Sequence, residues 1–518
     1  MTTIIDINIF SPHRRTDHRM TTDAILTDQP LDVVILGAGI SGIGAAHYLT
    51  TEHPGKAFAI LESRDSIGGT WDLFRYPGIR SDSDLNTFGY EFKPWRDPQA
   101  IADAPRILDY LHEAVADDRL ESKIAFRRRA VAADWSEADQ LWTLTVRHTD
   151  TGETSTVRTR WVFAGTGYYN YDEGFTPEFA GRESFTGQVV HPQHWPEDLD
   201  YAGKKVVVIG SGATAVTLVP SMAGEAEHVT MLQRTPTYVI PLPREDMIAN
   251  VLKKTLGAER GYKLSRRKNI LQQKFVYQFC QRFPGAARKV IRGTNAALLP
   301  RDFDLDTHFN PPYNPWDQRL CVVPDGDLFK ALRAGSASIE TGRIKRFVEN
   351  GIELESGELI EADIIVTATG LNLQLFGGME LRRDGEPIDL TETVAYRGVM
   401  LSTVPNWVLA IGYTNSSWTL KIGLICEYFC RMLTHMDENS YTSVRAIPPT
   451  GMQTRPLLDF GAGYVKRALD RLPVQGTTAP WTMTMAVSAD VKQLRKGEVV
   501  DDCLQYTSAE TTVTESVA

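Results

Sequence analysis

Three glycines near the start of the chain have the spacing of a turn that binds a dinucleotide. Gly37, Gly39 and Gly42 form the pattern GxGxxG, between an apolar run and an Ala-rich stretch typical of a helix. Such glycines permit a tight turn and let a pyrophosphate approach the N-terminus of the helix. A second apolar run ends in Glu62, twenty residues after Gly42, where a carboxylate would accept hydrogen bonds from ribose hydroxyls. These elements in register predict a first dinucleotide site.

The same pattern recurs near the middle of the chain with a different ending. Its turn, GxGxxA, consists of Gly210, Gly212 and Ala215. The strand that follows ends in Gln233, Arg234 and Thr235, so a cation and a hydroxyl stand where the first copy has its acid. A carboxylate would repel a 2′-phosphate, whereas a guanidinium binds it in a bidentate manner. The second site is therefore predicted to prefer NADPH to NADH, through Arg234 and Thr235.

Each copy is followed by the same series of elements. A β-hairpin or meander comes next, and then a strand that ends at a Thr-Gly turn. Two such halves are typical of flavoproteins in which one domain holds FAD and the other brings the nicotinamide to it. We expect an α/β fold with two Rossmann-like dinucleotide-binding domains, for FAD and NADPH, and a helical insertion. The expected units are a flexible extension (1–30), the first part of the FAD-binding domain (31–170), the NADPH-binding domain (171–365) with a basic helical insertion at about 247–299, and the second part of the FAD-binding domain with the C-terminal segment (366–518).

The bulk composition excludes several other classes of protein. Hydrophobic residues make up 42% and charged residues 23% of the chain, and no apolar run approaches the ~20 residues that span a bilayer. The five cysteines are scattered and lack the spacing of a metal site, which favours a reducing compartment and no bound metal. We therefore expect a cytoplasmic globular protein with no nucleic-acid partner.

The net charge of −10 conceals a basic segment. Between Met247 and Arg292 the chain has twelve Lys or Arg residues and a single acid, Glu259, which leaves −21 for the rest. Apolar side chains are interleaved with these cations. Three interpretations stay open: a solvated helical face, a surface for a partner, and a peripheral contact with an anionic membrane.

The residues after the first ribose strand narrow the class of enzyme. Flavin disulfide reductases carry a redox cysteine pair there, but residues 67–84 contain no cysteine. An amine oxidase would not need the second site, which has the features of an NADPH site. Of the three classes, a monooxygenase that uses both nucleotides fits best.

Residues 170–197, between the two glycine turns, are expected to form the linker between the domains, and a motif in this linker carries the most specific resemblance. Its matched positions, in the pattern FxGxxxHxxxWP, are Phe185, Gly187, His191, Trp195 and Pro196. With this motif the chain resembles the Baeyer–Villiger type of flavin monooxygenase. The resemblance covers most of the chain beyond Leu31 and is also carried by residues 68–78, 167–174, 191–201, 313–320 and 368–378.

The resemblance implies a reaction. In this family NADPH reduces FAD, and the reduced flavin reacts with O2 to give a C4a-peroxyflavin. This species inserts one oxygen next to a ketone carbonyl, which gives an ester or lactone. Oxidation of sulfides or thioamides is an expected second capacity. The alternative is a flavin-containing monooxygenase that acts mainly on amine or sulfur substrates.

The resemblance also assigns catalytic residues. An anionic peroxide needs a cation that stays charged, and the catalytic arginine of the family maps onto Arg319, with Asp82 as its partner. Each residue also has a purely structural alternative. Arg319 could form a salt bridge between domains, and Asp82 could be a turn residue or a helix N-cap. Gln318 stands where many members have a lysine that helps to hold the 2′-phosphate, so more of the binding of this phosphate depends on Arg234 and Thr235.

Further residues are expected around the flavin. The cofactor-binding residues after the first ribose strand are Gly69, Thr70 and Trp71. Other aromatic candidates for the pocket are Phe74, Tyr76, Trp316, Trp407 and Trp418. The segment 412–419 is expected to cover the flavin, and His191 and Trp195 are expected to control domain closure rather than to perform chemistry.

Overall fold

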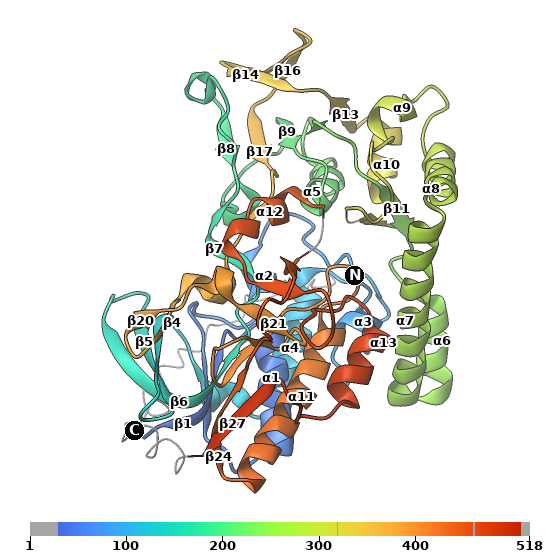
Figure 1. Ribbon diagram of the computed structural model, residues 1–518. Helices are drawn as coiled ribbons and strands as arrows, with labels where there is room; N and C mark the ends of the chain where they lie inside the picture. The colour runs from blue at the N-terminus through green and yellow to red at the C-terminus, as the bar shows by residue number, and fades with distance from the viewer. Residues whose placement is uncertain (1–28, 319, 459–460, 509–518) are drawn as a thin grey trace, which may run out of the picture.

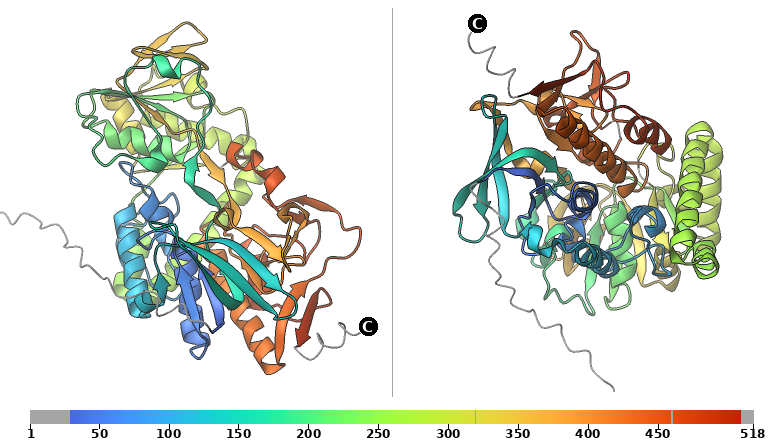
Figure 2. Two further views of the ribbon diagram at one scale, coloured as in Figure 1. Left: turned by 90° about the vertical axis from the view of Figure 1, so that its left-hand side faces the viewer. Right: turned by 90° about the horizontal axis from the view of Figure 1, so that it is seen from below.

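The structure is a computed structural model that describes residues 29–318, 320–458 and 461–508. Residues 1–28, which make up most of the predicted extension, and Arg319 lie outside the described residues. The elements form two lobes, each built on one large sheet (Figures 1 and 2). The predicted α/β fold with two Rossmann-like units is confirmed.

The first lobe is built on a nine-stranded sheet in the order β20-β19-β4-β5-β6-β1-β2-β3, with β23 also paired to β6. β1 pairs in parallel with both β2 and β6, and it is apolar because both of its faces are covered. Helix α1 (Ile40–Glu52) follows the first glycine turn and packs against α11 (Thr419–Glu438). The strands are β1 (Leu31–Leu36), β2 (Phe58–Leu61), β3 (Ile124–Ala125), β4 (Arg128–Ser136), β5 (Leu141–His148), β6 (Thr154–Ala164), β19 (Glu380–Arg383), β20 (Glu386–Pro387) and β23 (Trp407–Leu409).

The second lobe is built on a parallel sheet in the order β13-β10-β9-β17-β8. Helix α5 (Ala213–Met222) follows the second glycine turn, and α10 (Asp327–Ala334) packs beside it. An antiparallel meander of β14 (Ile344–Val348), β15 (Gly351–Leu354) and β16 (Leu359–Glu361) precedes the last strand. The strands of the sheet are β8 (Gln188–Val190), β9 (Lys205–Ile209), β10 (His228–Gln233), β13 (Ala337–Thr341) and β17 (Ile364–Thr367).

Two extended segments join the lobes side by side. β7 (Tyr169–Gly174) leaves the first lobe after β6, and β18 (Leu371–Leu373) returns to it after β17. The two strands pair with each other in antiparallel fashion. The region between residues 170 and 197, expected to be a linker, also supplies β8, which forms one edge of the second sheet. Three residues are too few to show the alternation that would have predicted a strand.

After β18 the chain returns to the first lobe and completes it. Besides the strands already given, this part contributes α11 and two small sheets. Their strands are β21 (Val394–Tyr396), β22 (Met400–Leu401), β25 (Thr454–Pro456) and β26 (Val474–Gly476) in one, and β24 (Tyr441–Ala446) with β27 (Leu504–Ser508) in the other. Its short helices are α12 (Gly463–Lys466) and α13 (Val487–Asp490).

The basic segment is helical, as predicted. It comprises α6 (Met247–Leu256), α7 (Ala258–Arg282) and α8 (Pro284–Leu298), drawn in yellow-green along one edge of the molecule (Figure 1). α7 extends from the second lobe to α3 (Leu85–Phe88) of the first lobe. Among the helices of the described residues, none is both long and apolar enough to cross a membrane.

Candidate active site

A cavity of about 370 Å³ lies where the two lobes meet. Residues of the first glycine turn and its ribose strand, among them Gly39 and Glu62, line one side. Thr214 and Thr217 of α5, the helix that follows the second glycine turn, line the other. Both dinucleotide motifs therefore face the same space, as hydride transfer between two nucleotides requires.

Close backbone contacts shape the first glycine turn. Gly37 has a φ of +92°, and a Cβ there would lie 3.1 Å from the carbonyl oxygen of Gly165. A Cβ at Gly42 would lie 1.9 Å from the carbonyl oxygen of Gly37. Gly39 and Gly69 face each other, and a Cβ at Gly69 would lie 3.2 Å from the Cα of Gly39. The backbone forms a smooth cradle that fits a pyrophosphate.

Glu62 directly follows β2, the first ribose strand, and is buried, with 4% of its surface exposed. Its Oε2 accepts a hydrogen bond of 2.7 Å from the N–H of Ala38, and Oε1 accepts one of 2.9 Å from the N–H of Arg64. Burial raises the pKa of Glu62, and these N–H donors act in the opposite direction. Because Glu62 also lines the cavity, its remaining lone pairs fit the hydroxyls of a ribose.

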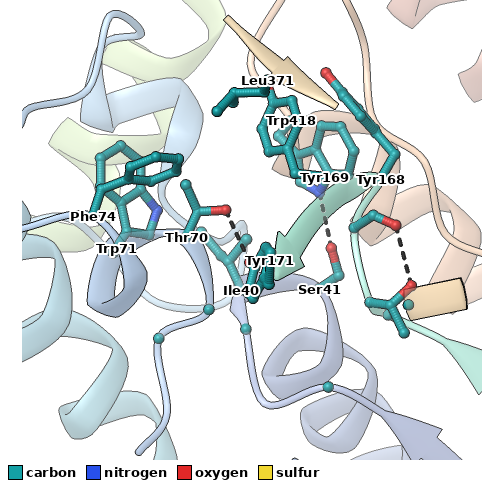
Figure 3. A pocket seen from close by; sticks show the side chains of 18 of the residues that line it. Ile40, Ser41, Thr70, Trp71, Phe74, Tyr168, Tyr169, Tyr171, Leu371 and Trp418 are labelled. Atoms are coloured by element: carbon teal, nitrogen blue, oxygen red, sulfur yellow. Dashed lines mark hydrogen bonds between the residues drawn. The ribbon is translucent and has the colours of Figure 1, made fainter. Parts of the chain in front are cut away.

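Aromatic side chains wall the cavity on two sides (Figure 3). Trp71 and Phe74 lie on one side, and Trp418 lies with Tyr168 on the other. The indole N–H of Trp418 donates a 2.8 Å hydrogen bond to Oγ of Ser41, at the start of α1. The segment expected to cover the flavin therefore lies beside the first glycine turn.

Two aromatic residues predicted for the pocket lie elsewhere. Trp407 is fully buried in the core of the first lobe, with its ring 5.0 Å from that of Trp142, because β23 carries it into the sheet. Trp316 packs against Tyr277 of α7, with ring centroids 5.6 Å apart. Tyr76, by contrast, lines the cavity.

The second glycine turn has similar backbone geometry in more open surroundings. Gly210 has a φ of +145°, and a Cβ there would lie 2.4 Å from the carbonyl oxygen of Ala368. A Cβ at Gly212 would meet no heavy atom of the described chain within 4 Å, which leaves room for a pyrophosphate. Ala215 is fully buried.

The two residues predicted to select NADPH, Arg234 and Thr235, and Gln233 before them have different environments. Gln233 is buried and donates hydrogen bonds of 2.9 Å to the carbonyl oxygen of His308 and to Oγ1 of Thr341. The carbonyl oxygen of Thr235 accepts a hydrogen bond from Ser211. Arg234 is exposed and makes no hydrogen bond or ion pair with any residue of the described ranges. Its guanidinium therefore fits a 2′-phosphate.

The first half of the linker motif packs into the second lobe. Phe185 is buried against Phe347, with ring centroids 6.3 Å apart. A Cβ at Gly187 would lie 2.2 Å from the carbonyl oxygen of Asp363, so the start of β8 requires a glycine there. Packing within the second lobe therefore explains why the motif has Phe185 and Gly187 at these two positions.

The second half of the motif contacts both connections between the lobes. Nε2 of His191 lies 3.3 Å from the carbonyl oxygen of Gly370, which precedes β18. A Cβ at Gly174, the last residue of β7, would lie 2.0 Å from Cε1 of the same ring. Burial lowers the pKa of His191. Trp195 packs on the core of the second lobe, and the half-buried Pro196 follows it.

Of the predicted catalytic arginine and its acidic partner, only the partner is among the described residues. Asp82 lines the cavity. Arg319 lies outside the described residues, but Val322, three residues further along in β12 (Cys321–Pro324), also lines the cavity. β12 pairs in parallel with β11 (Val239–Leu242) of the second lobe.

Several side chains at the site were not identified from the sequence. Oγ1 of Thr70 lies 3.1 Å from the hydroxyl of Tyr171, and burial raises the pKa of Tyr171 to about 12, so that this phenol stays protonated. Arg80, which lines the cavity, forms an ion pair of 2.5 Å with Asp327 at the start of α10, across the two lobes. The two partners of each pair lie far apart in the sequence, so no local pattern joins them.

The basic insertion also contributes to the site. Gln273 of α7 accepts a 2.8 Å hydrogen bond from Oγ of Ser416, which lines the cavity. The amide of Gln273 donates to Asp84 and Thr87 at 2.8 and 3.0 Å. The helix is therefore joined to the segment that contains Trp418.

This geometry defines a class of protein. It is a two-lobed α/β flavoprotein in which both dinucleotide-binding units border one cavity. The model of the flavin-binding monooxygenase-like family matches residues 31–377. The FAD-containing monooxygenase EthA of Mycobacterium tuberculosis is 50% identical over 478 residues, which cover 92% of this chain and 97% of that protein. The probable FAD-binding monooxygenase AlmA of Acinetobacter baylyi is 47% identical over 492 residues, with 94% and 98% covered.

Solved structures show the same fold. An oxidized steroid monooxygenase bound to NADP matches with a TM-score of 0.72 and 21% identity, over 93% of this chain and 100% of that one. An open crystal structure of cyclohexanone monooxygenase matches with a TM-score of 0.70 and 22% identity, over the same shares. The chain belongs to the flavin-binding monooxygenase-like family. It is a flavoprotein monooxygenase, as predicted.

Proposed function

We propose that this enzyme is an FAD-dependent, NADPH-consuming monooxygenase of the Baeyer–Villiger type, which inserts one oxygen atom of O2 next to a ketone carbonyl to give an ester or lactone. The observation that carries the proposal is the cavity bordered on one side by the first glycine turn and on the other by the start of α5, the helix that follows the second turn. The motif from Phe185 to Pro196 supports the ketone reaction in particular, and the fold shared with the cyclohexanone monooxygenase agrees with it. Sulfides or thioamides are a second class of substrate for the same site.

The chain's own residues bind and orient the reactants. Bound FAD, once reduced by NADPH, supplies the electrons that activate O2. The first glycine turn and Glu62 hold FAD, and the second glycine turn holds NADPH. Arg234 and Thr235 bind the 2′-phosphate. Trp71 and Trp418 exclude water from the cavity between the lobes.

Arg319 and Asp82 are proposed to stabilise the negative charge on the reacting oxygen, Arg319 directly and Asp82 through Arg319. Arg319 keeps a positive charge at every working pH, so it stabilises negative charge that develops on oxygen. Asp82, on the cavity wall, orients that guanidinium. His191 and Trp195 are proposed to position the lobes and take no part in the bond changes.

The test is product analysis with the FAD-loaded enzyme, NADPH, and linear, cyclic and aryl ketones together with a thioether. We expect esters or lactones from at least one class of ketone. Arg319→Ala should abolish ester formation, while oxidation of NADPH without product continues. Sulfoxide or N-oxide as the only oxygenated product would replace the proposal with the alternative, a monooxygenase of amine or sulfur substrates.

We also propose that the enzyme works in the cytoplasm and that its basic insertion contacts an anionic membrane surface. The charge of residues 247–292 supports this, because cations near such a surface contribute roughly 1 kcal/mol each. Absence of binding to anionic vesicles at low salt would refute the contact without affecting the oxygen chemistry.

A further inference from the structure

The exposed apolar side chains of this protein gather on the basic insertion. Of the fifteen large hydrophobic residues exposed in the described chain, ten lie between residues 247 and 290. The largest exposed fractions there are 69% for Phe275, 68% for Met247 and 65% for Leu271. Scattered exposed apolar residues are ordinary, but a cluster of this kind marks an interaction surface.

α7 has two sharply different faces. Tyr262, Arg266 and Asn269, spaced three or four residues apart, are buried against the first lobe. Leu264, Leu271 and Phe275 lie on the opposite, exposed face, again with helical spacing. The outer side chains of α6 and α8, among them Ile248, Val251 and Val290, are also exposed. We call the exposed surface of α6, α7 and α8 the docking face; it forms one edge of the molecule (Figures 1 and 2).

Hydrogen bonds on the inner face hold α7 in this orientation. The guanidinium of Arg266 donates to the carbonyl oxygens of Thr87 and Gly89 at 2.9 and 2.8 Å. Asn269 donates to Asp84 at 2.7 Å, one helical turn before the contacts of Gln273. A rotation that covered Leu271 and Phe275 would break these buried bonds, so the apolar residues stay exposed.

The charges on the docking face are positive with one exception, Glu259. Lys254, Arg267 and Lys274 are exposed, and none forms a hydrogen bond or ion pair with a residue of the described ranges. Glu259 is the only acid between Met247 and Arg301. Lys274 and Phe275 are adjacent, so a cation stands directly beside the most exposed aromatic ring.

We infer that the docking face inserts its apolar side chains into the interface of a bilayer that contains anionic lipids. An interfacial helix combines apolar residues on one side with Lys and Arg beside them, which meet the acyl boundary and the headgroups respectively. A second copy docked through the same face would bring like charges together, because a two-fold interface pairs a surface with itself. The inference rests on the proposed membrane contact, and it adds insertion to electrostatic attraction.

Vesicle sedimentation of the full-length, FAD-loaded enzyme tests the inference. The vesicles contain phosphatidylcholine alone or mixed with phosphatidylglycerol. We expect binding to the mixed vesicles only, with part of it retained at high salt. Leu271→Ser with Phe275→Ser should weaken binding about tenfold or more, and Arg267→Glu with Lys274→Glu should remove its dependence on anionic lipid.

The control pair is Leu359→Ser with Ile447→Ser, which removes exposed apolar side chains, 46% and 42% exposed, far from the docking face in the sequence. It should bind as the unchanged enzyme does, and all variants should keep the same NADPH oxidation. Binding that high salt abolishes and that the serine pair does not change would overturn insertion while leaving the electrostatic contact intact. Failure of the unchanged enzyme to bind would overturn both. Concentration-dependent self-association that the serine pair removes would assign the face to a second copy instead.

Discussion

The two dinucleotide turns share their backbone geometry but differ in how closely the protein surrounds them. In the first, Gly39 lies against Gly69, and the acid Glu62 is buried and held by two backbone N–H groups. In the second, Gly212 faces open space and the cation Arg234 is exposed. A closed turn suits a nucleotide that stays bound, whereas an open turn suits one that enters and leaves in each cycle.

The difference extends to the third position of each motif. Gly42 leaves no room for a methyl group, because a Cβ there would lie 1.9 Å from the carbonyl oxygen of Gly37. The second copy has Ala215 at the matching position, where the protein accommodates a fully buried methyl group. The first turn is therefore wound more tightly against its own helix than the second.

The largest effect is expected from Gly42→Ala. The added methyl group must push the first turn apart, at a cost of about 3 kcal/mol or more in the free energy of unfolding. We expect the purified protein to lack FAD, as measured by flavin absorbance, and to unfold at a lower temperature. The matched change in the second turn, Ala215→Gly, should cost only about 1 kcal/mol and leave FAD bound. Equal losses of FAD in both variants would contradict the comparison.

Arg234→Ala tests the open turn. Loss of a charge-assisted, bidentate contact with the 2′-phosphate should raise the KM for NADPH about 10- to 100-fold. The KM for NADH should stay nearly unchanged, because NADH has no 2′-phosphate. Steady-state oxidation of both nucleotides gives the ratio, with Arg333→Ala, another exposed arginine of the second lobe, as the control. A parallel rise of both KM values would assign Arg234 a structural role.

Contiguous motifs made much of this architecture predictable. The glycine turns, Glu62 and the strand before each turn lie within short stretches, and the physical need for glycine is local. The basic segment showed its helical character in the same way, through interleaved apolar and charged residues.

Contacts between distant residues could not be predicted. Arg80 and Asp327 are 247 positions apart, and Gln273 and Ser416 are 143 apart. Neither pair has a periodic or compositional signal, since either side chain would suit an ordinary surface. The places of Trp407 and Trp418 could not be predicted either. Trp407 lies in the core because β23 pairs with β6, whereas Trp418 lines the cavity.

Glu62→Gln tests the closed turn with a smaller effect. Weaker hydrogen bonds to the ribose should lower FAD affinity about tenfold, measured by titration of the apoenzyme. Burial raises the pKa of Glu62 above its ordinary 4.5, so the stability it contributes is present at low pH and lost as pH rises through the folded pKa. The glutamine variant has no such loss. Its amide NH2 cannot accept a bond from a backbone N–H, however, so the variant apoenzyme should melt at a lower temperature than the parent at low pH. This difference should shrink as the pH rises from 4.5 to about 8, and a difference that does not shrink would contradict the assignment.

The smallest effect concerns His191, which lies between the two turns and touches both connections. Its Nδ1 accepts a 3.2 Å hydrogen bond from the N–H of Gln193, and protonation would remove that acceptor, worth about 1 kcal/mol. Burial lowers the pKa of His191 below its ordinary 6.5, so the stability contributed by the neutral ring is present above pH 6.5 and lost as pH falls through the folded pKa. His191→Asn removes this titration. The melting temperature of the parent should therefore fall more steeply below pH 6.5 than that of the variant. Identical slopes would mean that protonation of the His191 ring does not change the stability of the protein.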